Sequence, residues 1–211
     1  MNTYTYVFEE IDYNFIELCK IGNIGNIINY YDENIKKGLD ISVNYYSGFR
    51  WCCKFGYVDV IKWFLNVSPN IDIQEIWAFH DALEFGKVDV AKLLLEFCPN
   101  LKIEAPEFIF WKCCSNGYLN VLKFIIDNKI YIPNIDDSDD MVGFTNAIDK
   151  LHYNIFEYLT NIILPNEEIK IYLEKELQKL KKKIKIKKTK LNVKRFKIIK
   201  LIKNYITPFN I

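Results

Sequence analysis

A ten-residue pattern occurs three times in the chain, and this repetition limits the fold more than any other feature of the sequence. The three segments begin at Gly56, Gly86 and Gly117 and read GYVDVIKWFL, GKVDVAKLLL and GYLNVLKFII. Their glycines are 30 and 31 residues apart, and weaker copies begin 34 residues to either side, at Gly22 and at Leu151. A period of this length is typical of proteins in which small helical units are stacked one on the next.

The residues around each glycine predict two helices joined by a tight turn. Before the glycine the chain reads FRWCCKF, FHDALEF and FWKCCSN, in which small or modest residues at the fourth and fifth positions suit a closely packed helix. Glycine supplies the positive φ of the turn. After it, apolar residues recur at three- and four-residue steps, which indicates a second helix with one buried face. A Pro-Asn turn and a short strand-like segment, Ile71 to Ile73 or Leu101 to Ile103, then lead to the next unit.

This unit resembles the ankyrin repeat over residues 10–165. The segment that begins at Gly56 corresponds to the family's GHLEVVKLLL, and FHDAL, residues 79–83, corresponds to the family's LHLAA. The Thr-Pro that opens the family's first helix is absent, and Pro-Asn replaces its Gly-Ala-Asp loop. The style, rich in Asn, Ile and Tyr, is similar to that of the ankyrin proteins of large DNA viruses, so a viral protein is expected.

The resemblance implies an all-α fold, an ankyrin-type solenoid of about five helix-turn-helix repeats with short hairpin loops. We expect this array to occupy residues 1–165, with turns near Gly22, Gly56, Gly86, Gly117 and Leu151. Residues 166–211 are expected to form a separate basic helical extension, because they carry 15 basic and 4 acidic side chains. Residues 1–165 carry 13 basic and 23 acidic side chains, so the two parts have opposite net charge.

The ankyrin family binds other proteins across the concave face of the array, so the resemblance implies a non-enzymatic scaffold for protein–protein interaction. The matching positions lie at the ends of the first helices and at the hairpin tips. They are Lys54, Phe55, Asp72, Glu84, Phe85, Lys102, Ser115 and Asn116. Phe55 and Phe85 are the expected anchors, because aromatic side chains dominate interface energetics. The partner is another protein of unknown identity, and no small-molecule substrate is expected.

The C-terminal extension supports a second interpretation. Apolar residues from Ile169 to Ile184 form a stripe typical of a helix, and a second helical stretch begins near Asn192. This extension either caps the array or binds a polyanion, nucleic acid or an anionic membrane, with the repeats as its carrier. The lysines that would make this contact are Lys181, Lys182, Lys183, Lys185, Lys187, Lys188 and Lys190. A nuclear import signal is the remaining option for the same lysines.

No residue pattern indicates catalysis, a metal or a cofactor. The paired cysteines at 52–53 and 113–114 are two repeats apart, too far for one zinc ion, and are expected to be reduced core residues. His80 and His152 lack a neighbouring nucleophile and are expected to be structural. The acidic run from Asp136 to Asp140 lacks the glycine and glutamate of a calcium loop and is expected to be a solvated loop.

The sequence indicates an intracellular protein. Acidic residues occupy the first segment, where a signal peptide would need a basic start and an apolar stretch. No apolar run approaches the roughly 18 residues that a membrane-crossing helix needs. We therefore expect a cytoplasmic location, in the host cytoplasm if the protein is viral, with a nuclear location as the alternative.

Overall fold

The computed structural model describes residues 10–75, 77–134, 138–163, 167–184 and 190–206. In these residues the chain is all-helical, with α-helices, one 3-10 turn (Ile35–Lys37) and no strand, which confirms the predicted all-α class. The segments at Ile71 and Leu101, predicted to be strand-like, are loops in which Ile71, Ile73 and Leu101 are nonetheless buried. The chain divides into two compact units, residues 1–104 and 105–211. The predicted boundary between residues 165 and 166 lies inside the second unit.

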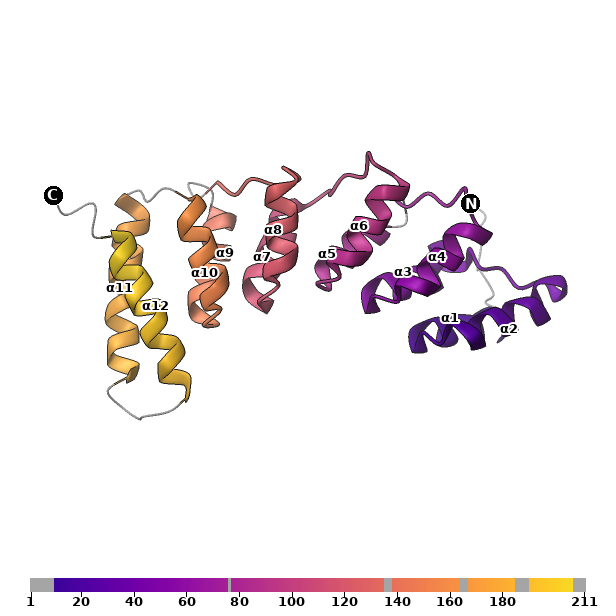
Figure 1. The fold of residues 1–211 in the computed structure, drawn as a ribbon, viewed down its shortest axis with the longest axis horizontal. Coiled ribbons are helices and arrows are strands. Elements are labelled where there is room, and N and C mark those ends of the chain that lie inside the picture. Colours follow the sequence, from indigo (N-terminus) through magenta and orange to yellow (C-terminus); the bar gives the residue numbers. More distant parts are fainter. Residues whose placement is uncertain (1–9, 76, 135–137, 164–166, 185–189, 207–211) are drawn as a thin grey trace, which may run out of the picture. The chain divides into compact units, whose positions relative to one another are not determined.

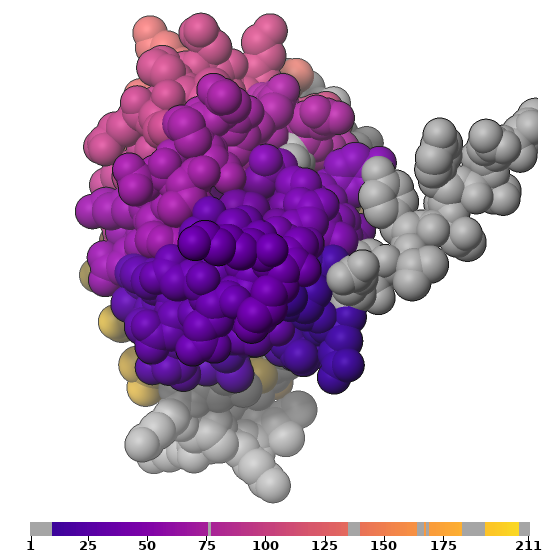
Figure 2. Space-filling model, turned by 90° about the vertical axis from the view of Figure 1, so that its right-hand side faces the viewer, coloured from indigo at the N-terminus to yellow at the C-terminus, as the bar shows by residue number. Residues whose placement is uncertain are grey.

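The described residues of the first unit form three helix pairs and the 3-10 turn between the first two pairs (Figure 1). The pairs are α1 (Glu10–Ile21) with α2 (Ile24–Asn34), α3 (Val43–Phe55) with α4 (Val58–Val67), and α5 (Ala78–Glu84) with α6 (Val88–Phe97). The first helices α1, α3 and α5 contact each other in sequence, and each also contacts its own second helix. Aromatic rings fill the interior, and the rings of Phe15 and Phe49 both meet Phe64 edge to face. Figure 2 shows the N-terminal helices, coloured indigo to violet, as a closely packed surface.

The second unit contains two further helix pairs and a helical hairpin. The pairs are α7 (Pro106–Asn116) with α8 (Leu119–Asp127) and α9 (Ser138–Asp149) with α10 (Tyr153–Ile162). The hairpin is formed by α11 (Glu167–Ile184) and α12 (Lys190–Ile206). Helix α7 contacts α9, α8 contacts α10, and α12 contacts both α10 and α11. The C-terminal hairpin is therefore packed on the last helix pair.

The turn between the two helices of a pair has the same hydrogen bond in four pairs. The amide of the residue after the turn position donates to the carbonyl five residues earlier: Tyr57 to Cys52, Lys87 to Ala82, Tyr118 to Cys113 and His152 to Ala147, at 3.0, 2.8, 3.0 and 2.8 Å. This bond is the signature of a helix that ends in a left-handed residue. The accepting residues are the small ones at the fourth position of the predicted first helix.

The residue in the turn has positive φ in every pair. It is glycine in four of them, with φ between 77° and 86°, but Leu151 in the last pair, with φ of 60°. Two turns also need glycine because a side chain covers them closely. A Cβ on Gly22 would lie 2.3 Å from the ring of Tyr57, and one on Gly117 would lie 2.8 Å from the ring of His152. The side chain after one turn thus covers the turn of the preceding pair.

The acidic run extends into the first turn of α9, where one of its carboxylates is buried. Residues 135–137 lie outside the described residues, but Asp140 is only 1% exposed. Its carboxylate accepts hydrogen bonds from the hydroxyl of Tyr131 and from the backbone amide of Asn134. The prediction of a solvated loop is therefore wrong for Asp140. This carboxylate ties the loop to the start of α9, because a buried carboxylate is tolerated only when donors surround it.

The C-terminal hairpin buries the apolar stripe predicted for its first helix. Ile169, Leu173, Leu177 and Leu180 are all buried in α11. In α12 the buried residues are Ile198, Ile199, Ile202, Tyr205 and Ile206. The hydroxyl of Tyr205 donates to the carbonyl of Ile163 at 2.8 Å, which fixes α12 to the end of α10. Phe196 of the same helix is 58% exposed.

Because Leu151 has a left-handed backbone conformation, we predict that glycine at this position gives a more stable protein than alanine. Leu151→Gly and Leu151→Ala remove the same half-buried side chain, but only glycine adopts positive φ without steric cost. We expect the glycine variant to be more stable than the alanine variant by about 1 kcal/mol. Urea unfolding followed by circular dichroism measures this difference. An alanine variant as stable as the glycine variant would show that residue 151 is not held at positive φ.

Candidate functional site

The predicted contact residues of the first unit lie around aromatic rings on the first helices. Phe55 and Phe85 stand at the C-terminal ends of α3 and α5 and are 42% and 41% exposed. Lys54 connects the two helices, because its Nζ lies 5.6 Å from the centre of the Phe85 ring and 5.0 Å from that of Trp51. From α1, the Nζ of Lys20 lies 5.1 Å from the ring of Trp51. We call Lys20, Trp51, Lys54, Phe55 and Phe85 the aromatic patch.

Lys20 and Trp51 are the two members of this patch that the sequence did not predict, and Trp51 is the aromatic one. Its ring stacks on Phe55 with the ring centres 5.5 Å apart. The signal was present, because residues 51 and 55 are four apart and therefore lie on the same side of a helix. Trp51 directly precedes Cys52 and Cys53, which are both buried in the core.

The second unit carries a related arrangement on α7. The Nζ of Lys112 lies 5.1 Å from the ring of Phe108 and 5.8 Å from that of Trp111, and these two rings stack 6.0 Å apart. Phe108 is 37% exposed. Cation–π contacts at exposed sites contribute about 0.5–1 kcal/mol. Each unit therefore presents partly exposed aromatic rings combined with a lysine on a first helix.

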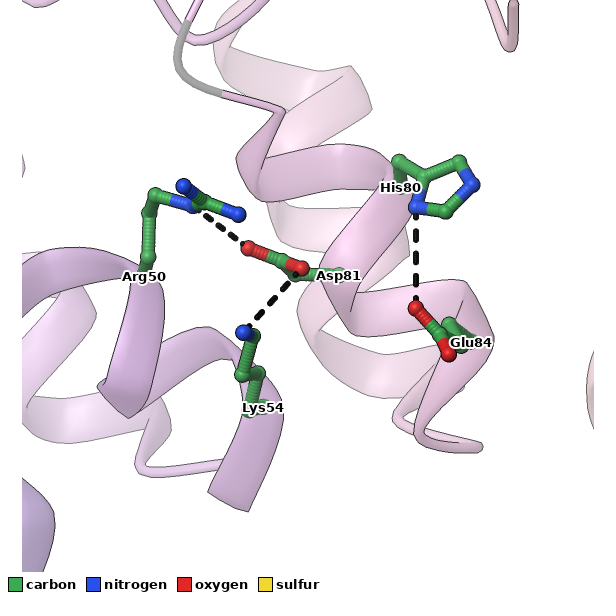
Figure 3. Close-up of polar contacts among 5 residues, drawn as sticks. All are labelled: Arg50, Lys54, His80, Asp81 and Glu84. Carbon is green, nitrogen blue, oxygen red and sulfur yellow. Dashed lines mark hydrogen bonds and ion pairs between the residues drawn. The ribbon is translucent and has the colours of Figure 1, made fainter. Parts of the chain in front are cut away.

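A buried aspartate pairs with Lys54 of the aromatic patch (Figure 3). Asp81 is 4% exposed, and its carboxylate accepts from Nε of Arg50 at 2.7 Å and pairs with Nζ of Lys54 at 3.5 Å. Both cations come from α3, whereas Asp81 belongs to α5. This interaction links two neighbouring repeats and holds Lys54 against the rings. It stands where the ankyrin consensus has leucine, so the apolar consensus gave no reason to expect it.

His80 and Glu84 adjoin the same aspartate on α5. The Nδ1 of His80 lies 3.9 Å from Oε2 of Glu84, so Glu84, one of the predicted contact residues, is half-buried and engaged within its own helix. The ring of His80 also meets Trp77 edge to face at 5.4 Å. Burial lowers the pKa of His80 below its usual 6.5, although Glu84 and Asp81 act in the opposite direction. Neutral His80 is therefore the favoured form in the folded chain.

His80, Asp81 and Glu84 have their potential ligand atoms within 4.8 Å of one another. Three such atoms are a possible metal site by composition. The Asp81 carboxylate, however, already faces two cationic side chains, one on each oxygen. A metal ion would have to displace or tolerate both, so the electrostatics of this cluster oppose cation binding.

The residues predicted at the hairpin tips have unequal roles. Asp72 is exposed, but its Oδ1 accepts from the amides of Gln74 and Glu75, both at 3.0 Å, and so shapes its own turn. The side chain of Gln74 donates to the carbonyl of Lys102 and accepts from its amide, at 3.1 and 2.8 Å. Gln74 thus joins two successive loops, a contact that the sequence did not indicate. The side chain of Lys102 remains exposed.

The two predicted contact residues of the second unit differ in exposure. Asn116 is exposed at the end of α7. The hydroxyl of Ser115 is buried and has no hydrogen-bond partner among the described residues. Its carbonyl oxygen lies 3.0 Å from Nε2 of His152. Ser115 is therefore part of the junction between two helix pairs, and its hydroxyl does not face solvent.

The cysteines are free thiols, and five of the six are buried. Burial raises the pKa of Cys113 to about 12 and raises the pKa values of Cys53 and Cys114 well above the usual value. The pKa of Cys52 is raised mainly by its interaction with Cys19, with burial as the next cause. A thiolate is the reactive form, so these side chains lack the character of nucleophiles.

The lysines of the alternative prediction are only partly described. Lys181 and Lys182 are exposed in the last turns of α11. For Lys183 and Lys190 only the backbone is described. Lys185, Lys187 and Lys188 lie outside the described residues. Among the helices of the described chain, none is long and apolar enough to cross a membrane. No protein-family model and no curated protein matches the sequence.

The lowered pKa of His80 predicts a pH-dependent stability. Because the unfolded chain binds the proton more readily than the folded one, stability is fully present above pH 6.5 and falls as the pH drops through the folded pKa. One such group changes the free energy of unfolding by at most about 1.4 kcal/mol per pH unit. Urea unfolding between pH 6.5 and about 5 should show this loss, and His80→Gln should reduce it.

The matched control is His152→Gln, because the chain contains two histidines. This variant retains His80 and should retain its pH dependence. A wild-type chain whose stability is constant over this range, or a His80→Gln variant with an unchanged slope, would contradict the burial of neutral His80.

Proposed function

We propose that the chain is a protein-binding scaffold of the ankyrin type, and that the aromatic patch of the first unit is its principal contact surface. The observation that carries this proposal is the partial exposure of Phe55 and Phe85 on neighbouring first helices, with Lys54 held between the rings of Phe85 and Trp51. Large aromatic side chains at the surface are enriched where proteins bind one another.

The repeat geometry supports the ankyrin assignment. Five helix pairs turn at the five positions that the resemblance implied, and four of them share the same turn hydrogen bond. The first helices contact each other within each unit, as expected when every unit buries its apolar face against a neighbour. In such an array the partner would lie on the concave face, which is formed by the first helices and the hairpin tips.

The patch is preorganised, which favours binding. Lys54 is held by Asp81 at 3.5 Å, and Lys20 by Glu17 at 2.6 Å, so both ammonium groups are fixed next to the Trp51 ring. Rings that are already ordered lose little conformational entropy when a partner covers them. The second group of rings on α7 offers an additional contact on the same kind of helix.

No described residue suggests enzymatic chemistry at this surface. The cavity nearest His80 has a volume of about 10 Å³, enough for a single water molecule. A substrate site is usually a concave pocket of about 300–1,000 Å³. An open surface of rings and lysines is suited to a macromolecular partner rather than to an enclosed reaction.

The proposal predicts that partner binding depends on the two phenylalanines. We expect Phe55→Ala/Phe85→Ala to weaken a captured partner by roughly thirtyfold, the effect of losing about 2 kcal/mol at an interface hot spot. The measurement is capture from lysate by the immobilised chain, quantified against increasing free chain. Because both rings are more than 40% exposed, thermal unfolding should change little.

Phe97→Ala is the matched control. Phe97 is 42% exposed, the same as Phe55, but it ends α6, a second helix. The Phe97→Ala variant should bind the partner as tightly as the wild type does. Equal binding by the double variant and the control, or unfolding of the double variant, would show that the aromatic patch is not the contact surface.

A further inference from the structure

Helix α12 is the most strongly basic element of the described chain. Its 17 residues include six basic side chains and no acidic one. Lys194, Lys197, Lys200 and Lys203 follow at three-residue steps and are all exposed. Residues three apart are neighbours on a helix surface, so these lysines form one row along α12. The row lies outside the lysine-rich segment that the sequence indicated.

The opposite side of α12 is already occupied. Its apolar residues are buried against α10 and α11, and the hydroxyl of Tyr205 is bonded to the carbonyl of Ile163. A helix that binds a membrane surface must place its apolar face among the lipids. Helix α12 could do so only by leaving the hairpin, so the fold favours a ligand that contacts the charged row alone.

An exposed aromatic ring stands beside the row. Phe196 is 58% exposed. It lies four positions from Lys200, so these two side chains are neighbours on the helix surface. This combination of phosphate-binding charge and an exposed aromatic ring is characteristic of surfaces that bind unpaired nucleotides.

A groove continues the basic row toward α10. It has a volume of about 240 Å³ and is lined by Lys194 and Lys197 from α12 and by His152, Tyr153 and Asn154 from the start of α10. The Nζ of Lys197 lies 5.2 Å from the ring of Tyr153. The acid nearest in α10, Glu157, accepts a hydrogen bond from the Tyr153 hydroxyl at 2.8 Å and does not line the groove.

We propose that the outer face of α12 binds single-stranded nucleic acid. The phosphates follow the lysine row and the groove, and an unpaired base stacks on Phe196. This function uses a surface of the second unit and is independent of the proposed protein-binding patch. A duplex would present no free base to Phe196, and a membrane would require an apolar face that is already buried.

The test is the binding of the full chain to fluorescently labelled oligothymidylate over a range of salt concentrations. Each single-strand phosphate that a lysine neutralises contributes about 0.7 to the slope of log K against log salt. We therefore expect Lys194→Gln/Lys197→Gln/Lys200→Gln to reduce this slope by about 2 and to weaken binding at least about tenfold at low salt. Glutamine retains the helix propensity, so far-ultraviolet circular dichroism should be unchanged.

Two further variants serve as controls. One tests whether binding depends on where the lysines lie rather than on the net charge of the chain, and the other tests whether a base stacks on Phe196. Lys36→Gln/Lys62→Gln/Lys92→Gln removes the same charge from exposed lysines of the first unit and should leave binding unchanged. Phe196→Ala should weaken oligothymidylate binding about tenfold without altering the salt slope, because stacking carries no counterion release.

Several results would overturn the proposal. Equal weakening by both lysine variants would show that binding follows net charge rather than the α12 face. A duplex that binds as tightly as the single strand, with no effect of Phe196→Ala, would show that no base is stacked. Binding to vesicles that contain anionic lipid, without binding to oligothymidylate, would assign the row to a membrane.

Discussion

The structure depends on the close approach of neighbouring first helices, which small residues at one position make possible. Cys52, Ala82, Cys113 and Ala147 occupy this position, and each is fully buried. Each also gives its carbonyl to the hydrogen bond that closes the following turn. A larger side chain there would separate the helices and break the turn together, because protein interiors are close-packed and do not absorb added volume.

The same close approach of the first helices determines which charged side chains are paired at the junction between repeats. Asp81 is buried between two first helices, so it must be paired, and Arg50 and Lys54 supply the charge. Lys54 is consequently held against Trp51 and Phe85, where its ammonium group becomes part of a surface. The aromatic patch is thus a result of how two repeats are joined. A contact that stabilises the array also shapes the face on which we propose that a partner binds.

The helices and turns could be predicted from the sequence because their determinants are local. The apolar period and the glycines are visible in single segments, and spacing alone located the turn at Leu151 although its residue type opposes the conformation. Phe55 and Phe85 are partly exposed, which agrees with the prediction that they are accessible to a partner. These features depend on residues within a few positions of one another, which a repeat makes recognisable.

The remaining features depend on residues from different repeats. The Arg50–Asp81 and Gln74–Lys102 contacts join residues 31 and 28 positions apart, and the sequence does not say which polar side chains meet across a junction. Asp140 was expected in solvent because it belongs to an acidic run, yet its donors come from the loop before it. Phe196 is 58% exposed in a helix whose residues Ile198, Ile199 and Ile202 are buried, and the order of residues along the chain does not say which apolar side chain the hairpin covers.

The reactivity of the cysteines tests the close packing of the repeats most directly. Among the six thiols only Cys98 is partly exposed. The other five are buried in the first helices α1, α3 and α7. Alkylation under native conditions, followed residue by residue with mass spectrometry, should therefore modify Cys98 first. The remaining five should react only at the rate of unfolding, and all six should react in denaturant. Modification of the pairs at 52–53 and 113–114 as fast as Cys98 would show that the first helices do not pack on one another.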